Sequence, residues 1–269
     1  MKPQACVTVV IPCYKCANTI ERAVESIFNQ TLQPKEVILV DDASPDQTLE
    51  KLEEIKKKYP SEWIKIKSLK NNKGPGTARN TGWNLSTQPY IAFLDSDDSW
   101  HPQKIEIQYN WMKRHPNATL TADNYEILEE GKEIKHENHP VEDISTAPIK
   151  KHQLLISNRI STPCVMLKRE IPFRFKEEKK YSEDYLLWCE ILFSKNECYK
   201  IEPPLTYLYK PAYGKSGLSS HILSMGAGEL KAFYLLYKSS AISFPVYMLA
   251  SAWSTTKLVR RIAFGLIKK

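Results

Sequence analysis

The sequence predicts an α/β protein with a mixed, mostly parallel sheet and a helical extension at the C-terminal end. Over residues 1–100, short apolar segments alternate with segments of helical periodicity, which is typical of a parallel sheet covered by helices on both faces. Acidic pairs directly follow two of the apolar segments. Because ligands of such sheets bind beyond the carboxyl ends of the strands, we expect a site there.

The first hundred residues predict strands and helices in strict alternation. Residues 6–11 are apolar and β-branched, and a helix with a capping-box start at Asn18 follows them. Residues 36–40 form the next strand, after which Ser44 caps a helix that ends before Pro60. The other elements of this half are a strand at 63–68, a helix at 77–85 and a strand at 90–94.

The remainder of the chain is less regular. A helix runs from Pro102 to about residue 114. A hairpin is expected from 119–129 and 132–137 around a Glu130-Gly131 turn, and the segment 138–152 is polar and weakly patterned. The last predicted elements are a strand at 164–168, a helix at 182–193 and a strand at 205–209.

Composition indicates an ordinary globular protein of 269 residues, with 42% hydrophobic and 26% charged side chains. The N-terminus leads straight into a strand without the pattern of a secretion signal, so we expect a cytoplasmic protein. Six scattered cysteines fit reduced, packed thiols. The Cys13-x-x-Cys16 pair lacks a second pair with zinc-site spacing, which disfavours a zinc site.

The C-terminal tail carries the net charge of +7. No acidic residue follows Glu229, and the 31 basic residues up to that point balance the 31 acidic ones. Residues 244–267 mix apolar side chains with cations and lack the ~20 apolar residues that a membrane span needs. We expect a basic amphipathic helix that lies on an anionic membrane surface, or alternatively a helix packed on the domain. Without a basic stripe in the body, no nucleic-acid partner is expected.

The strongest chemical signal is the run Asp95-Ser96-Asp97-Asp98, which directly follows the predicted strand at 90–94. Mg²⁺ and Mn²⁺ take oxygen ligands and usually complete their shell with substrate phosphates. A nucleoside diphosphate is the natural partner of such a site. Acidic turns are also common as solvated loops or helix caps. The choice between these interpretations and a metal site therefore depends on the neighbouring motifs.

Two neighbours lie at the same edge of the predicted sheet. Asp41-Asp42 ends the second strand, where a carboxylate can bind a base or ribose or can cap the loop before Pro45. Residues 74–76 form a glycine-containing loop at a helix start that suits anions, with Arg79 available for a phosphate or base. A dinucleotide fingerprint would need a third glycine at Arg79, and this disfavours a dehydrogenase.

Glu183-Asp184 opens a predicted helix. Carboxylates at a helix start commonly interact with the macrodipole. The functional alternative is a general base that removes the proton of an acceptor hydroxyl.

Together these motifs resemble glycosyltransferase family 2. The resemblance covers Val9-Val10-Ile11-Pro12-Cys13-Tyr14, residues 37–44, 74–80 and 95–98, and Glu183-Asp184, in the order and spacing of that family. Most of the matching motifs lie in the first hundred residues, fewer lie between there and about Leu218, and none lies in the tail. It implies a GT-A fold: a glycosyltransferase domain at 1–218, divided into a nucleotide-binding half (1–100) and an acceptor-binding half (101–218), with an extension at 219–269.

The resemblance also implies roles for individual residues in an inverting transfer from a nucleoside-diphosphate sugar, most simply a UDP-sugar. Asp184 matches the catalytic base. The nucleotide-sugar contacts would be Pro12, Tyr14, Asp42, Arg79, Asp95 and Ser96, and the ligands of Mn²⁺ or Mg²⁺ would be Asp95, Asp97 and Asp98. Acceptor contacts are expected around 138–162 and near the tail.

The chain also departs from the family pattern. The family often has asparagine where Lys15 stands, and the Gln-x-x-Arg-Trp motif of processive synthases is absent, so we expect a non-processive enzyme. The tail and the family together suggest a saccharide or lipid-linked saccharide acceptor in bacterial surface polysaccharide or lipopolysaccharide synthesis, with the protein peripheral on the cytoplasmic face of the inner membrane. The alternatives are a sugar-nucleotide pyrophosphorylase and a non-catalytic, membrane-associated carbohydrate- or nucleotide-binding protein.

Overall fold

The computed structural model describes residues 3–129, 131, 136–177, 181–209 and 222–267. Within these residues one mixed sheet runs through the molecule in the order β3-β2-β1-β4-β8-β6-β9-β5, and β7 pairs with β9 beside this row. The strands are β1 (Gln4–Cys13), β2 (Gln33–Asp41), β3 (Ile64–Ser68), β4 (Tyr90–Phe93), β5 (Ser99–Trp100), β6 (Ala118–Ile127), β7 (Thr146–Pro148), β8 (Val165–Lys168) and β9 (Glu197–Leu208).

The first four strands are parallel neighbours, as the alternating sequence pattern predicts. β8 is antiparallel to both β4 and β6, so that the sheet continues into the second half of the chain without a break. The chain passes from β1 to β2 and β3 on one side and returns to β4 on the other. That reversal beside β1 creates the crevice in which α/β sheets bind ligands.

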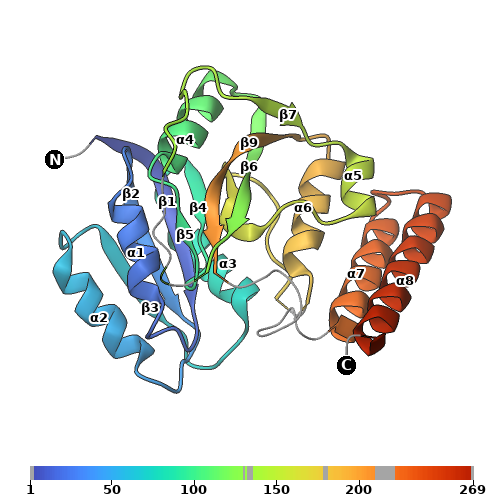
Figure 1. Cartoon of the computed structure of the whole chain (residues 1–269), viewed down its shortest axis with the longest axis horizontal. Coiled ribbons are helices and arrows are strands. Elements are labelled where there is room, and N and C mark those ends of the chain that lie inside the picture. Colours follow the sequence, from blue (N-terminus) through green and yellow to red (C-terminus); the bar gives the residue numbers. More distant parts are fainter. Residues whose placement is uncertain (1–2, 130, 132–135, 178–180, 210–221, 268–269) are drawn as a thin grey trace.

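Helices cover both faces of the sheet (Figure 1). The helices α1, α2 and α4 pack on one face and α3, α5, α6 and α7 on the other, giving two main hydrophobic clusters. The helical elements are α1 (Ile20–Phe28), α2 (Thr48–Lys58), α3 (Pro75–Leu85), α4 (Lys104–Arg114), α5 (Lys151–Ile156), α6 (Glu183–Phe193), α7 (Ile222–Lys238), α8 (Phe244–Ile267) and the short 3₁₀ helix η1 (Thr162–Cys164).

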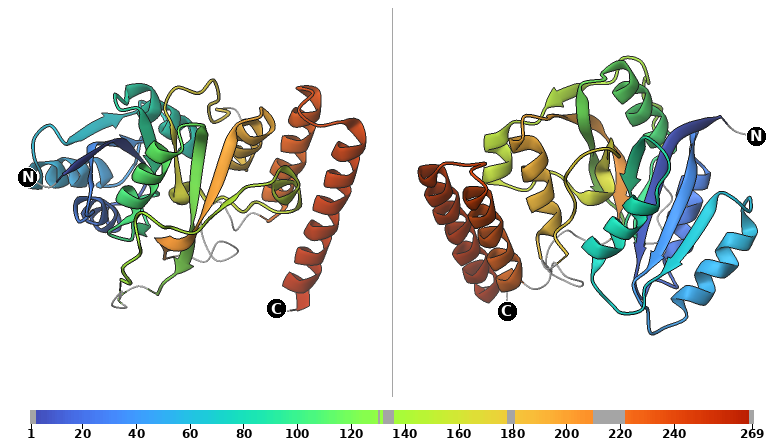
Figure 2. Two further views of the ribbon diagram at one scale, coloured as in Figure 1. Left: turned by 90° about the horizontal axis from the view of Figure 1, so that it is seen from above. Right: turned by 180° about the vertical axis from the view of Figure 1, so that it is seen from behind.

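The C-terminal extension is the helix pair α7–α8, which stands at one end of the molecule (Figures 1 and 2). α7 packs on α6, with the rings of Phe233 and Tyr185 in a T-shaped contact at 6.0 Å between centroids. α8 reaches α5, since the indole of Trp253 donates to the carbonyl of Ile156 over 3.1 Å. No helix in the described part of the chain has the length and apolar character to cross a bilayer.

Two predicted helix starts are wrong. α1 begins at Ile20 after Thr19, without a side-chain cap, because the backbone N–H groups of both residues bond to the carbonyl of Cys16 in a turn. α2 begins at Thr48 and not at Pro45. The hydroxyl of Ser44 is used elsewhere, since it accepts the backbone N–H of Lys15.

Other elements differ in extent. The last strand spans Glu197–Leu208 and is longer than the predicted 205–209, because it pairs along its length with β6. β5, β7 and α5 are short and were missed in the sequence pattern. The predicted return strand at 132–137 and its turn fall largely outside the described residues.

A close approach of α3 to β1 depends on Gly82. A Cβ atom at this position would lie 2.3 Å from Cγ1 of Val10, a fully buried side chain in the middle of β1. Such a distance is far inside van der Waals contact. The missing side chain therefore lets the helix that follows the glycine loop lie directly on the sheet.

We expect Gly82→Ala to destabilise the protein. Overpacking costs about 1–3 kcal/mol, against a gain in helix propensity of about 1 kcal/mol, so the net loss should reach at most about 2 kcal/mol. Urea unfolding followed by circular dichroism measures it. Asn84→Ala, at an exposed position of the same helix, is the control and should leave stability unchanged or slightly raised. Equal stability of both variants would contradict the close contact.

Candidate active site

The ends of β1, β2 and β4 bring the predicted motifs together at one edge of the sheet. Cys13 lies opposite Asp41 in the parallel register of β1 and β2, and Val10 lies opposite Phe93 in that of β1 and β4. The backbone N–H of Asp42 then bonds to the carbonyl of Cys13 over 2.8 Å. Residues that directly follow these three strands are therefore neighbours in space.

Asp42 is buried and holds the glycine loop. Its two carboxylate oxygens accept the backbone N–H groups of Lys73 over 2.8 Å and Gly74 over 2.7 Å. Burial raises the pKa of this carboxyl, although the two hydrogen bonds oppose the rise. Gly74 has φ of 86°, which places it in the conformational region that favours glycine. The carboxylate thus sets the entry of the chain into α3.

Arg79 joins two of the predicted motifs. Its guanidinium donates to Oδ1 of Asp95 over 2.7 Å and lies 3.7 Å from Oε1 of Glu183. The side chain is 7% exposed. Burial alone would lower the pKa of Arg79, but the carboxylates of Asp95 and Glu183 outweigh that effect and raise it. Arg79 was predicted as a nucleotide contact, and the contacts it makes here are to protein carboxylates.

The acidic run is a turn with two environments. Asp95, Ser96 and Asp97 are partly exposed, whereas Asp98 is buried. Burial raises the pKa of the Asp98 carboxyl well above its usual range, and the charges of Asp95 and Asp97 add to the rise. Asp97 and Asp95 are therefore the carboxylates in this turn that remain accessible to a ligand.

A side chain from α1 supports the same turn from outside. The guanidinium of Arg22 donates to the backbone carbonyl of Asp97 and stacks 3.6 Å from the centroid of the Tyr209 ring. The Tyr209 hydroxyl lies 3.1 Å from that of Ser99. These contacts line a shallow hollow of about 200 Å³ between α1 and β5.

Glu183 and Asp184 begin α6, as predicted, and face different neighbours. Glu183 is buried and packs against Gly76, where a Cβ atom would lie 3.1 Å from its Cγ. Asp184 is half-buried. Its Oδ1 accepts the backbone N–H of Tyr185 over 2.7 Å, and its Oδ2 accepts the hydroxyl of Thr162 over 3.4 Å. Ser182 precedes them in a left-handed conformation with φ of 56°.

The predicted base-binding residues lie where β1 ends. Pro12 is partly buried, and the Tyr14 side chain is 45% exposed. The Lys15 ammonium lies 5.5 Å from the centroid of the Tyr14 ring. An exposed aromatic ring at the end of β1 offers a flat surface on which a base could stack.

The donor set fits a hard divalent cation when substrate phosphates supply the remaining ligands. Within the described residues no three His, Cys, Asp or Glu side chains are grouped closely enough to hold a metal by themselves. Mg²⁺ and Mn²⁺ commonly bind through one or two carboxylates and substrate phosphates. Asp97 and Asp95 provide such a pair.

Sequence reasoning missed several residues that shape the site. Thr162 and Arg22 carry no local motif, and their contacts come from elements far away in the chain. Asn80 forms a reciprocal pair with the backbone of Phe175, donating over 2.7 Å and accepting over 3.0 Å. Only Asn80 had a sequence signal, because it closes the glycine-loop motif.

Comparison with known proteins agrees with this arrangement. The family model described as glycosyl transferase family 2 matches residues 8–173, more than half of the chain. This chain belongs to glycosyltransferase family 2. The match includes the ends of β1, β2 and β4 and the start of α3, and it makes the protein a nucleotide-sugar glycosyltransferase rather than a pyrophosphorylase.

Among curated relatives of this family 2 enzyme is UDP-Glc:alpha-D-GlcNAc-diphosphoundecaprenol beta-1,3-glucosyltransferase WfgD of Escherichia coli. It is 32% identical over 192 residues, which make up 71% of each chain. The chain spans only 36–41% of the length of three uncharacterized glycosyltransferases of Rickettsia species that it also matches.

Solved structures show that the family 2 chain has the GT-A-like fold. S. aureus TarS 1–349 in complex with UDP-GlcNAc has a TM-score of 0.67 at 19% identity, covering 86% of this chain and 66% of that one. The mannosyltransferase PcManGT from Pyrobaculum calidifontis, in complex with GDP-Man and Mn²⁺, has a TM-score of 0.64 at 16% identity, covering 98% and 80%.

We expect Arg79→Met to destabilise the protein strongly, because it leaves the carboxylates of Asp95 and Glu183 without the cation between them. Arg79 and Glu183 are both buried, and removing one partner of a buried pair costs about 3–5 kcal/mol. Guanidinium chloride unfolding at pH 7 measures the loss. Lys51→Met, which breaks the exposed pair between Lys51 and Glu21, should cost less than about 1 kcal/mol. A similarly small loss in Arg79→Met would contradict the bridging role.

Proposed function

We propose that this enzyme transfers one sugar from a UDP-sugar to a saccharide on a lipid carrier, with inversion at the anomeric carbon. The observation that carries the proposal is the bridge from Asp95 through Arg79 to Glu183. It joins the acidic turn after β4 to the first residues of α6, where Asp184 lies. The groups proposed to hold a diphosphate and to remove a proton would thus belong to one connected site.

The donor end of the proposed site lies at β1 and β2. Tyr14 and Pro12 would border the base, and Asp42 would bind the base or ribose in addition to holding its loop. A UDP-sugar is favoured because the relative WfgD is named for UDP-Glc and the structural neighbour TarS binds UDP-GlcNAc. The neighbour PcManGT was solved with GDP-Man, so donors with a guanine base should be tested as well.

The diphosphate would lie against the acidic turn. Asp97 and Asp95 would hold Mn²⁺ or Mg²⁺ there, Ser96 would contact the nucleotide sugar, and the buried Asp98 fits a ligand role least. The ion would offset the negative charge that builds up on the leaving phosphate. The structural neighbour PcManGT, solved with Mn²⁺, supports the choice of metal. The hydrogen bond from Arg79 would hold the Asp95 carboxylate in place beside the diphosphate.

Asp184 is the proposed catalytic base. A half-buried carboxylate at a helix start is reachable by an acceptor hydroxyl, and both of its oxygens are already oriented by Tyr185 and Thr162. It would take the proton of the hydroxyl while the acceptor oxygen bonds to the anomeric carbon and the bond to the diphosphate breaks. Attack from the side opposite the leaving group inverts the configuration at that carbon.

We expect a nucleoside diphosphate to be released from one donor in a panel of nucleotide sugars, with Mn²⁺ or Mg²⁺ and not with a chelator. Asp97→Ala should lower this release at least about 100-fold at a fixed metal concentration, because it removes an electrostatic contribution of that size. Asp184→Asn should lower turnover about 10²–10⁴-fold while leaving donor binding unchanged.

Coupled detection of UDP or GDP and calorimetric titration with the nucleotide measure these effects. The control is Asp46→Asn, an exposed carboxylate in the loop before α2. If Asp184→Asn kept full turnover, Asp184 would not be the catalytic base. If the wild type bound a donor but released no nucleoside diphosphate, the non-catalytic binding alternative would replace the proposed function.

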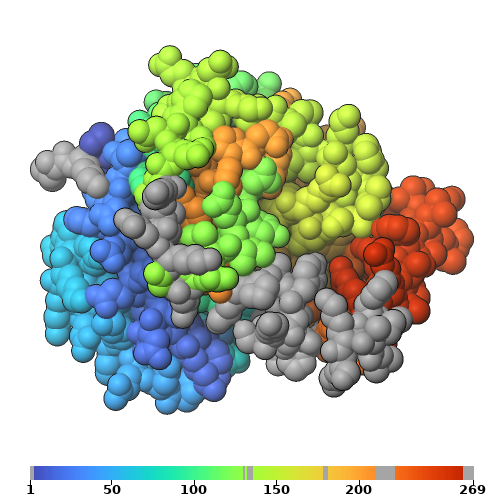
Figure 3. Space-filling model, viewed as in Figure 1, coloured from blue at the N-terminus to red at the C-terminus, as the bar shows by residue number. Residues whose placement is uncertain are grey.

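The helix pair α7–α8 is the proposed contact with the membrane. Its outer surface exposes large apolar side chains, and no acidic residue follows Glu229, which pairs with Lys257 over 2.7 Å. The space-filling view shows the pair as one end of the molecule (Figure 3). The exposed apolar residues are Leu223, Tyr234, Tyr237, Phe244, Met248, Leu249, Trp253, Val259 and Ile262.

An apolar surface with cations, on which the acidic Glu229 is paired with Lys257, suits the headgroup region of an anionic bilayer. The relative WfgD is named for an acceptor on diphosphoundecaprenol, a lipid. A membrane-bound acceptor would require the enzyme to work at the bilayer surface. We therefore propose a peripheral enzyme of bacterial surface polysaccharide or lipopolysaccharide synthesis on the cytoplasmic face of the inner membrane.

We expect the full chain to sediment with vesicles of phosphatidylethanolamine and phosphatidylglycerol, less so at high salt. The double variant Met248→Glu/Leu249→Glu should bind at least about tenfold more weakly, since each buried apolar side chain contributes about 1.5–3 kcal/mol. Leu249 is 72% exposed, so the fold should tolerate the change. The double variant Asn84→Glu/Asn117→Glu, at two exposed positions outside α7 and α8, adds the same two charges and is the matched control. Equal sedimentation of both variants, or none with wild type, would contradict the membrane contact.

A further inference from the structure

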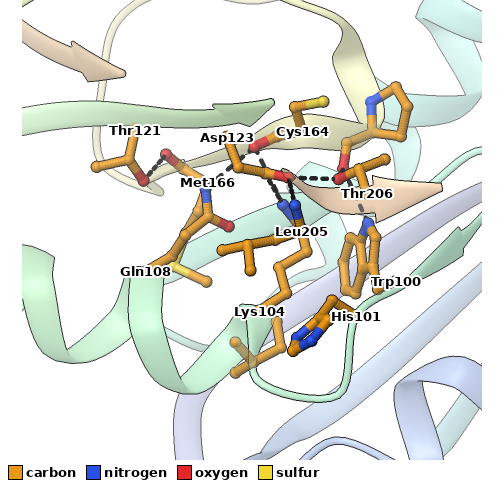
Figure 4. A network of polar contacts seen from close by, with 12 residues as sticks. Trp100, His101, Lys104, Gln108, Thr121, Asp123, Cys164, Met166, Leu205 and Thr206 are labelled. Atoms are coloured by element: carbon orange, nitrogen blue, oxygen red, sulfur yellow. Dashed lines mark hydrogen bonds and ion pairs between the residues drawn. The ribbon is translucent and has the colours of Figure 1, made fainter. Parts of the chain in front are cut away.

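The short helix η1 is held by side-chain donors that come from distant elements (Figure 4). The indole N–H of Trp100 donates to the carbonyl of Pro163 over 2.8 Å. The carbonyl of Cys164 accepts the ammonium of Lys104 over 3.1 Å and the amide of Gln108 over 3.0 Å. Two of the three carbonyls of this one-turn helix are thus fixed by β5 and α4.

A fully buried ion pair anchors these donors. Lys104 and Asp123 are both 0% exposed and form a salt bridge, and Asp123 also accepts the hydroxyl of Thr206 over 2.7 Å and the backbone N–H of Leu205 over 3.2 Å. Removing two charges from water is costly, and apolar residues of similar size often stabilise a fold as well. The pair between Lys104 and Asp123 therefore suggests that the position of η1, to which Lys104 donates, matters for function.

The residue that η1 presents to the proposed active site is Thr162. It is 4% exposed, and its hydroxyl donates to Oδ2 of Asp184 over 3.4 Å. The other oxygen, Oδ1, accepts the backbone N–H of Tyr185. Each oxygen of the carboxylate thus has a donor of its own, and one of the two donors belongs to a segment separated from α6 in the chain.

We propose that Thr162 is a positioning residue that fixes the orientation of the Asp184 carboxylate, and that the buried network around Lys104 and Asp123 holds Thr162 in place. The inference rests on the proposed function, in which Asp184 is the base. A base held about one ångström from its productive position loses much of its effect. Trp100 lies two residues beyond Asp98, so the same network also ties the base to the acidic turn.

The test is a double-mutant cycle on turnover, with donor hydrolysis measured for the full chain on the UDP-sugar that it releases fastest. The single variants are Thr162→Val and Asp184→Asn. Thr162→Val should lower kcat about 10–100-fold with an unchanged KM for the donor. In the Asp184→Asn background the same change should have an effect of less than about threefold, because a positioning residue acts only through the residue it positions.

Thr162→Ser is the conservative control. It keeps the hydroxyl and should restore kcat to within about threefold of wild type, whereas a purely structural role would leave it impaired through the lost methyl group. Thermal unfolding of all variants checks that they are folded. Full additivity of the two changes, or a kcat of Thr162→Val equal to wild type, would overturn the proposal.

A second measurement separates this inference from the proposed function. If wild type hydrolyses no donor, the proposed function fails, and the crystal structures of wild type and Thr162→Val still decide the positioning role. The proposal expects the Asp184 carboxylate to leave its wild-type orientation in Thr162→Val and to keep it in Thr162→Ser. An unchanged Asp184 in Thr162→Val would overturn it whatever the activity.

Discussion

The contact of Arg79 with Asp95 and Glu183 is the constraint on which the site depends. One buried cation lies between the acidic turn after β4 and the start of α6, and these segments are about ninety residues apart in the chain. Without a guanidinium between them, the buried Glu183 and the partly exposed Asp95 would be two carboxylates of like charge at this edge of the sheet. The bridge converts that repulsion into a fixed geometry.

The bridge is possible only because α3 lies directly on the sheet. Gly82 allows the helix to approach Val10, and Asp42 holds the loop from which α3 starts. Arg79 on the first turns of α3 is thereby delivered to the ends of the strands. Gly82 and Asp42 together fix the position of Arg79. Because Arg79 contacts Asp95, the glycine loop and the acidic turn are linked.

The sequence predicted the first half of the fold well because a parallel sheet buries whole strands. Residues 36–40 and 90–94 are nearly continuous apolar runs that end in aspartates, and such runs have few alternative structures. Helix starts were predicted less well. Ser44 has the local features of a cap, yet its hydroxyl accepts the N–H of Lys15 from another strand end, a partner that only the folded sheet brings near.

Prediction was weaker for the second half, where β7, α5 and the full length of β9 were missed. β9 carries Pro203 and Pro204, which argue against a strand by local rules, and it forms because β6 offers a parallel partner over most of its length. For the site, the motifs predicted Asp95, Asp97, Arg79 and Asp184, and the structure brings Asp95 and Arg79 into contact. Thr162 and Arg22 act through contacts between distant elements and leave no periodic or local signal.

The sequence alone therefore determined the fold class, the family resemblance and the residue types of the site, because these depend on local periodicity and on motifs of a few neighbouring residues. Tertiary structure decided which of those residues contact each other. It turned Arg79 toward two carboxylates, buried Asp98 while leaving Asp97 accessible, and set Thr162 against Asp184. The physical reason is that burial and pairing are properties of positions in space, and packing across the sheet brings together residues whose separation in the chain carries no such information.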